Sequence, residues 1–187
     1  MARWDPGTED RLRRAALELY AEHGYDNVTI TQIAERAGIT RRSYFRYFPD
    51  KREVLFAGVD QLPPAIVDAV LASEEQAALA VALDAARQVG GLLVARAEQT
   101  AERRAVIESS PELRERERSK AAAITAAIED GLGRRGVAAG EARLVARLAA
   151  VALQEAFERW IDTGEDFASC LEAAVASIRE ALYSPGR

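Results

Sequence analysis

Residues 29–48 read TITQIAERAGITRRSYFRYF, two short amphipathic segments joined by AGIT. Gly38 can end the first segment in the left-handed conformation that glycine adopts easily. Thr40 is a suitable N-cap for the second segment, residues 41–48, which must end near Pro49 because a residue before proline avoids helical geometry. The sequence therefore predicts a helix-turn-helix. The apolar positions that share one face of its first helix are Ile30, Ile33, Ala34 and Ala37.

Helical patterns continue on both sides of this motif. Residues 8–23 have apolar side chains at helical spacing, with Thr8 as a candidate N-cap and Gly24 as the stop. Residues 51–62 are expected to form a further helix that Asp50 caps. The prolines at positions 63 and 64 should interrupt or end that helix.

The second half of the chain predicts longer helices. One run extends from about residue 75 to residue 100 and contains the Gly90–Gly91 pair, which implies close packing, a kink or space for something else. Ser110 and Pro111 open another helix, which later glycines end. Two further helices occupy the last 45 or so residues, separated by TGED. Ala is abundant and β-branched residues are sparse, so we expect an all-α protein of about nine helices.

The composition excludes several classes of protein. The chain has one histidine, one cysteine and no glycine-rich phosphate loop, which argues against an enzyme, a metal site or a bound cofactor. No apolar run reaches the length of a signal peptide or a membrane span. We therefore expect a soluble, cytoplasmic protein that does not bind membranes.

Positive charge is concentrated at one place in an acidic chain. The net charge is −5, yet between residues 41 and 52 five basic side chains stand against one acidic side chain, Asp50. A helix-turn-helix places its second helix in the major groove of DNA, and arginine can bond guanine O6 and N7 with two donors. These side chains are therefore candidates for binding double-stranded DNA. A solvated cationic helix is the alternative interpretation of the charge alone.

The aromatic residues of the second helix divide into two pairs. Tyr44 and Phe48 are spaced i, i+4 and should pack the helix against the rest of its domain. Phe45 and Tyr47 should lie nearer the DNA, where Tyr47 can donate to a phosphate and Phe45 can only pack. Lys51 should lie at the start of the next helix, near a phosphate.

The stretch from residue 15 to residue 56 resembles the tetracycline-repressor (TetR) family of bacterial regulators. The resemblance rests on a helix ending in HGY, then TxxxIAxxAG, a short aromatic helix ending in YF, and DKxxxL. It implies a three-helix DNA-binding domain, residues 1–52, followed by a helical effector-binding and dimerisation domain, residues 53–187. Family contacts fall on Thr29 and Thr31, on residues 40–43, on Tyr47 and on Lys51. The family usually has tyrosine where Phe45 stands.

The resemblance implies a homodimeric one-component regulator, a repressor in our interpretation, that a small apolar or amphiphilic effector releases from a roughly palindromic operator. The alternatives are an architectural protein that binds DNA without sequence preference and a regulator that answers to another protein. The expected DNA-binding residues are Thr29, Thr31, Thr40, Arg41, Arg42, Ser43, Phe45, Arg46, Tyr47 and Lys51.

Two further sets of residues are expected to bind partners. The candidate effector contacts are Gln88, Leu92, Gln99, Thr100, Glu108 and Ser109. Apolar side chains on the last two helices are expected to form the dimer interface, although closing the core of one subunit is an equal alternative for Phe157 and Trp160. The interface candidates are Val145, Leu148, Ala152, Leu153, Phe157, Trp160, Leu171, Val175 and Ile178.

Overall fold

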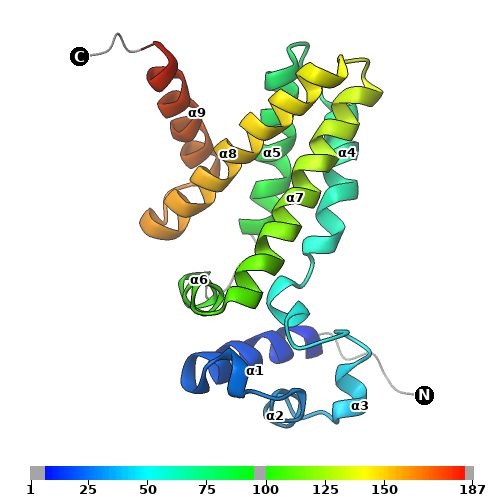
Figure 1. Ribbon diagram of the computed structural model, residues 1–187, viewed down its shortest axis with the longest axis vertical. Helices are drawn as coiled ribbons and strands as arrows, with labels where there is room; N and C mark the ends of the chain where they lie inside the picture. The colour runs from blue at the N-terminus through cyan, green and yellow to red at the C-terminus, as the bar shows by residue number, and fades with distance from the viewer. Residues whose placement is uncertain (1–6, 95–99, 184–187) are drawn as a thin grey trace. The chain divides into compact units, whose positions relative to one another are not determined.

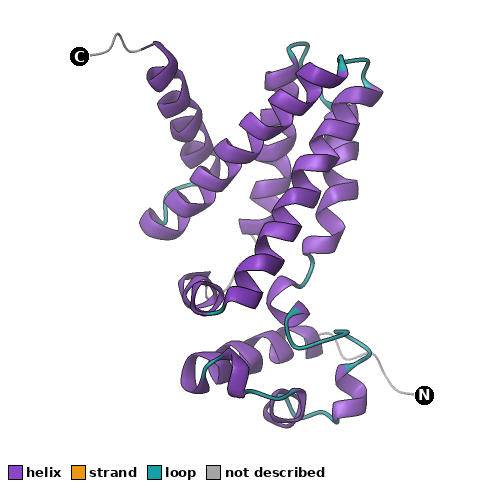
Figure 2. Cartoon of the chain, in the orientation of Figure 1, coloured by secondary structure: helices purple, strands orange, loops and turns teal. Residues whose placement is uncertain are grey.

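The computed structural model describes residues 7–94 and 100–183, and within them the chain is all helical (Figures 1 and 2). This confirms the expected fold class and the expected number of helices. The α-helices are α1 Thr8–His23, α2 Ile30–Arg36, α3 Arg41–Tyr44, α4 Leu62–Ala72, α5 Ala78–Val94, α6 Thr100–Ser109, α7 Pro111–Arg134, α8 Ala139–Thr163 and α9 Phe167–Tyr183. Three short 3₁₀ turns are η1 Tyr25–Asn27, η2 Glu53–Phe56 and η3 Val59–Gln61.

The chain divides into two compact units. Unit 1 contains Met1–Asp60 and Gln99–Ser119, and unit 2 contains Gln61–Glu98 and Lys120–Arg187. Helix α7 starts in unit 1 and continues into unit 2. No helix in residues 7–94 or 100–183 combines the length and the apolar character that crossing a membrane requires.

Helix α1 spans the predicted residues, Thr8–His23, but its N-cap is not the predicted one. Gly7 is the N-cap, with a φ of 100° and no side-chain cap bond. Thr8 is instead the first helical residue, and its buried hydroxyl accepts a hydrogen bond from Arg11 Nη2 at 3.0 Å. The prediction that Thr8 caps α1 is therefore wrong, because a glycine in the left-handed region turns the chain one residue earlier.

The helix-turn-helix forms where the sequence predicts it. Thr29 caps α2 through a capping box with Gln32, and Gly38, at a φ of +74°, ends that helix. Thr40 caps α3 by accepting the backbone N–H of Ser43 at 3.1 Å. Helix α3 is shorter than predicted and ends at Tyr44, whose carbonyl then accepts the N–H groups of residues 47 and 48 as a tightened turn before Pro49.

Residues 51–62 do not form the predicted single helix. Asp50 caps this segment as expected, but the backbone makes the short turns η2 and η3, with Gly58 at a φ of +80° between them. Pro63 and Pro64 begin α4 and do not end a helix. A proline fits the first helical turn because its missing N–H has no partner there.

Unit 1 has one apolar core that the sequence pattern did not reveal in full. Leu12, Ile33 and Tyr44 are fully buried under the helix-turn-helix. The same core includes Val106, Ile107 and Leu113, from α6 and the start of α7. Helix α6 itself was not predicted, because only two of its ten residues are buried and apolar.

Unit 2 is packed tightly around small residues. Helix α8 packs along α9, and α5 packs against both. Where α5 meets α9, a Cβ built on Gly90 would lie 2.2 Å from Cε1 of Phe167. The sequence left close packing, a kink or free space as explanations of the glycine pair, and close packing applies to Gly90. A Cβ on Gly91 would meet no atom within 4 Å.

Candidate nucleic-acid interface

Helix α3 and the turn after it have a buried aromatic side and an exposed basic side. Tyr44 and Phe48 are buried, as their spacing predicts, and their ring centroids are 5.8 Å apart. Phe45 is 46% exposed, and the guanidinium carbon of Arg41 lies 5.4 Å from the centre of its ring. The aromatic packing inside unit 1 therefore holds this segment in place with its cationic side chains in solvent. The exposed arginines are Arg41, Arg42 and Arg46.

Two of these arginines have no competing partner within the described residues. The side chains of Arg42 and Arg46 make no hydrogen bond and no ion pair there. Arg41 only stacks on Phe45. Free guanidinium groups on one short segment suit an anionic ligand, because no ion pair has to be broken before they bind.

The threonines predicted to contact DNA have different surroundings. Thr29 Oγ1 donates to Oε1 of Gln32 at 2.8 Å and accepts that residue's N–H. The hydroxyl of Thr40 bonds the hydroxyl of Ser43 at 3.0 Å. Thr31 is exposed and Tyr47 is half-buried. The caps therefore fix the starts of α2 and α3, whereas Thr31, which is exposed like the other two threonines, caps neither helix.

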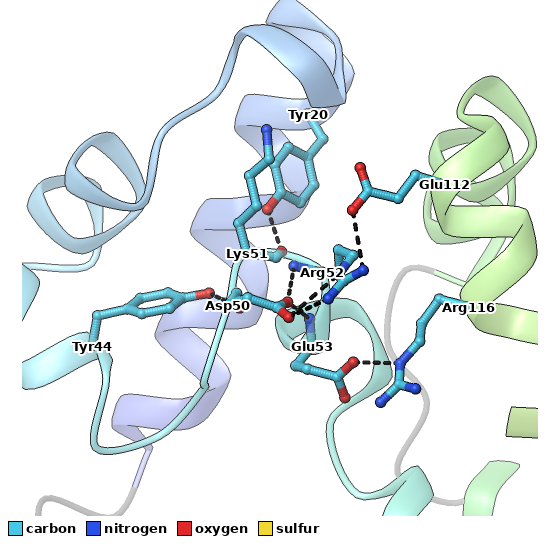
Figure 3. A network of polar contacts seen from close by, with 8 residues as sticks. All are labelled: Tyr20, Tyr44, Asp50, Lys51, Arg52, Glu53, Glu112 and Arg116. Atoms are coloured by element: carbon cyan, nitrogen blue, oxygen red, sulfur yellow. Dashed lines mark hydrogen bonds and ion pairs between the residues drawn. The ribbon is translucent and has the colours of Figure 1, made fainter. Parts of the chain in front are cut away.

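Residues 50–53 connect the helix-turn-helix to the rest of unit 1 (Figure 3). The hydroxyl of Tyr44 donates to the Asp50 carbonyl at 2.9 Å, and the hydroxyl of Tyr20 donates to the Lys51 carbonyl at 2.5 Å. Burial raises the pKa of both tyrosines, so both stay protonated donors at neutral pH. These bonds tie the end of the α3 turn to α1.

The carboxylate of Asp50 organises the same segment. It accepts the backbone N–H groups of Arg52 at 2.8 Å and Glu53 at 3.1 Å. Burial opposes its charge, but hydrogen bonds from the Arg52 side chain and from those two N–H groups outweigh burial, so the pKa of the Asp50 carboxyl lies below its usual value. Arg52, one of the five basic side chains between residues 41 and 52, is thereby held at an acidic partner.

Two ion pairs join this segment to the first turns of α7. Arg116 Nε donates to Glu53 Oε1 at 2.5 Å, and Arg52 Nη1 lies 3.3 Å from Glu112 Oε1 (Figure 3). The Glu53 side chain is only 9% exposed, so Arg116 neutralises a carboxylate that water barely reaches. Arg103 of α6 adds a bond to the Leu55 carbonyl at 2.8 Å. Sequence reasoning missed these contacts, because nothing in the sequence pairs residues about 50 to 60 positions apart.

Lys51 was expected to contact a phosphate, but its ammonium group is occupied inside unit 1. Nζ donates to the carbonyls of Tyr25 at 2.8 Å, Val28 at 3.0 Å and Asp26 at 3.4 Å. It also lies 4.2 Å from the centre of the Tyr25 ring. An ammonium group has three donors, and each of them has a carbonyl here.

The candidate effector contacts are divided between the two units. Gln88 is in unit 2 and donates to Asp84, whereas Thr100, Glu108 and Ser109 are in unit 1. Glu108 pairs with Arg104, and Ser109 donates to the Val106 carbonyl. Gln99 and the side chain of Leu92 lie outside the described residues.

Gln88 also lines an open hollow of about 400 Å³ in unit 2. Its lining is mostly polar, whereas the expected effector is a small apolar or amphiphilic molecule. The residues that line it are Ala72, Ser73, Glu74, Glu75, Asp84 and Gln88. Among the described residues, no three His, Cys, Asp or Glu side chains are grouped as a metal site would require.

The candidate interface residues differ in their exposure within the single chain. Val145, Ala152, Leu153 and Leu171 are buried inside unit 2. The half-buried group is Leu148, Phe157, Trp160, Val175 and Ile178. Phe157 packs against Phe167 at 4.8 Å between ring centroids, so it contributes to the subunit's own core. The exposed large apolar side chains on α8 are Leu144, at 60%, and Val151, at 57%.

Comparison with known proteins finds relatives of the segment that contains the helix-turn-helix. Residues 12–57 match the family described as bacterial regulatory proteins, tetR family. The chain is 38% identical over 63 residues to the HTH-type transcriptional regulator TcmR of Streptomyces glaucescens, and 42% identical over 50 residues to SrpR of Pseudomonas putida. These matches cover 34% and 27% of this chain but only 28% and 24% of those relatives.

Solved structures resemble the chain over nearly its whole length. NalD, the secondary repressor of the MexAB-OprM multidrug efflux pump in Pseudomonas aeruginosa, has a TM-score of 0.60 at 18% identity, with 92% of this chain and 95% of NalD covered. The SmeT–triclosan complex has a TM-score of 0.57 at 18% identity, with 91% of each chain covered. At such identities the likeness shows a shared fold. The chain therefore shares its fold with these regulators, and its residues 12–57 resemble the TetR family of bacterial regulatory proteins in sequence.

Proposed function

We propose that the protein is a one-component bacterial transcriptional regulator, a repressor, that binds operator DNA through the exposed basic side of α3 and the turn after it. The observation that carries this proposal is that the side chains of Arg42 and Arg46 have no partner within the described part of the chain, while buried aromatic residues fix the backbone beneath them. A pre-positioned arginine can bond guanine with two donors, and that contact depends on sequence. Residues 1–52 carry DNA binding in this proposal, and residues 53–187 carry effector binding and dimerisation.

Competition against unrelated DNA tests this function. The protein should select a roughly palindromic duplex from a random-sequence pool and retain it in excess nonspecific DNA at fixed salt, because base contacts add to the phosphate attraction. Retention should also depend on intact half-sites, about 34 to 36 Å apart for a dimer. Equal competition by scrambled duplex would instead support an architectural protein that binds without sequence preference.

The proposed regulator acts as a homodimer, and the exposed face of α8 supplies its contact. Leu144, Leu148 and Val151 are spaced i, i+4, i+7 and so share one helix face, where two of them are more than half exposed. A two-fold axis through such a face pairs it with itself. The buried residues Leu153 and Leu171 support this face from inside the subunit.

Glutamate at Val151 tests the dimer contact. Val151→Glu should weaken dimerisation roughly tenfold, because it replaces an apolar contact of about 1.5 kcal/mol and brings like charges together across the axis. Light scattering over a range of concentrations measures this change. Ala122→Glu, which adds the same charge at an exposed position of α7, is the matched control. An unchanged dimerisation constant for Val151→Glu would rule out this face.

A small apolar or amphiphilic effector releases the DNA in this proposal. Helix α7 runs from unit 2 into unit 1, where Glu112 and Arg116 pair with Arg52 and Glu53. An effector that displaces α7 would therefore act on the segment that follows α3. About 1 to 3 kcal/mol of coupling would change DNA affinity 5- to 150-fold. A screen of metabolites for a raised denaturation midpoint would find a binder, since only a ligand of the native state raises it.

The other expectations follow from this role. Operator DNA, a second subunit and the effector are the proposed partners, no catalytic step is part of the function, and the bacterial cytoplasm is the proposed location.

A further inference from the structure

The ammonium group of Lys51 is bound as a structural group. Its three nearest acceptors are main-chain carbonyls at 2.8, 3.0 and 3.4 Å, all within residues 25–28. The ring of Tyr25 covers it at 4.2 Å from the ring centre, which adds a cation–π attraction. A phosphate at this position would have to compete with three carbonyls for the same three donors.

The backbone of Lys51 is fixed as firmly as its side chain. The Tyr20 hydroxyl donates to the Lys51 carbonyl at 2.5 Å, and Tyr20 and Tyr25 pack edge to face at 5.3 Å between ring centroids. Asp50, immediately before it, is held by Tyr44 of α3. The lysine side chain therefore starts from a point that α1 and α3 both define.

The bonded carbonyls immediately precede α2. Val28 is the residue before Thr29, which caps that helix, and Lys51 follows the Pro49–Asp50 step that ends the α3 turn. Lys51 thus links the segment that enters the helix-turn-helix to the segment that leaves it. The exposed Thr31 lies in the first turn of α2, directly beyond this link.

We propose that Lys51 is a positioning residue that links the two ends of the helix-turn-helix by hydrogen bonds and thereby fixes the position of the start of α2 relative to bound DNA. In this role Lys51 does not pair with a phosphate. This inference rests on the proposed DNA-binding function. It replaces the phosphate contact that the charge of Lys51 and the family resemblance both suggest.

The salt dependence of binding separates the two roles. Each phosphate contact contributes about 0.9 to the slope of log affinity against log salt. Lys51→Met should lower affinity for the duplex that the wild-type protein selects by roughly tenfold at every salt concentration, with the slope unchanged. Arg46→Met, which removes an exposed and unpaired cation, should reduce the slope by about 0.9. All measurements are made well below the lowest melting temperature of the set, so that every variant is folded.

Two further variants test positioning against a general loss of stability. Lys51→Arg should not restore affinity, because a planar guanidinium cannot direct donors at three carbonyls as an ammonium does. Thr31→Val should weaken binding less in the Lys51→Met background than in the wild type, since the start of α2 is already misplaced there.

Three results would overturn the inference: a reduced slope for Lys51→Met with recovery in Lys51→Arg, an equal effect of Thr31→Val in both backgrounds, or unchanged affinity. Failure of the wild-type protein to select any duplex would instead overturn the proposed function, and the role of Lys51 would fall with it.

Discussion

Replacing Arg41 and Arg42 together with methionine is expected to lower affinity for the selected duplex about 100-fold or more. Both side chains are exposed on α3, whose buried face holds the backbone still. Each two-donor contact with guanine is worth about 1–3 kcal/mol, so losing two of them produces an effect of this size. Discrimination against a scrambled duplex should fall along with affinity. Fluorescence anisotropy with both duplexes at one salt concentration measures the two quantities.

A charge-matched control separates base contacts from net charge. Arg118 and Arg134 are exposed on α7, each in an exposed ion pair, and replacing both with methionine removes the same two charges. Exposed ion pairs contribute little to stability, so this control should fold normally and keep most of its discrimination. If the Arg41/Arg42 variant still distinguished the selected duplex from the scrambled one as the wild type does, these arginines would not read bases.

Gly90→Ala is expected to destabilise the protein by about 2 kcal/mol, which lowers the Tm of a chain of this size by roughly 4–8 °C. The added methyl group would lie 2.2 Å from Phe167 Cε1 and 2.4 Å from Cζ. That ring cannot move away cheaply, because it is 4% exposed and packs against Phe157. The clash should therefore exceed the gain of up to about 1 kcal/mol that alanine brings to a helix interior.

The neighbouring glycine provides the matched control. Gly91→Ala makes the same chemical change one residue later, where nothing lies within 4 Å of the new Cβ, and it should stabilise the protein by about 0.5–1 kcal/mol. Both substitutions restrict the unfolded chain equally, so the difference between them isolates the contact with Phe167. Thermal unfolding of both variants measures it, and equal shifts would contradict the packing argument.

Local signals in the sequence predicted the helix-turn-helix well. Gly38 and Thr40 act on residues within one turn of themselves, and both behave as their chemistry requires. Tyr44 and Phe48 were placed correctly for the same reason, since i, i+4 spacing fixes a shared helix face. The family resemblance then supplied the proposed function, which the residue pattern alone left open.

Features that depend on distant residues were not predictable. The carbonyls bound by Lys51 lie 23 to 26 residues earlier in the chain, so the sequence offered only its charge, which suggested a phosphate. The segment after Asp50 has the composition of a helix, yet Gly58 and bonds to Tyr20 and Tyr44 hold it in short turns. The burial of Leu153 and Leu171 depends on how α8 and α9 pack, which periodicity does not reveal.

Unit 1 is built from two separate stretches of the chain, which limits the segments that can be exchanged between this chain and similar proteins. A fragment that ends at residue 60 lacks Val106, Ile107 and Leu113, which complete its core. Burying three such side chains is worth about 5 kcal/mol, comparable with the whole stability of a small domain. A hybrid protein that takes only the amino-terminal segment from this chain would therefore have a poorly packed core beneath its helix-turn-helix. Helix α6 and the first turns of α7 must be transferred together with that segment.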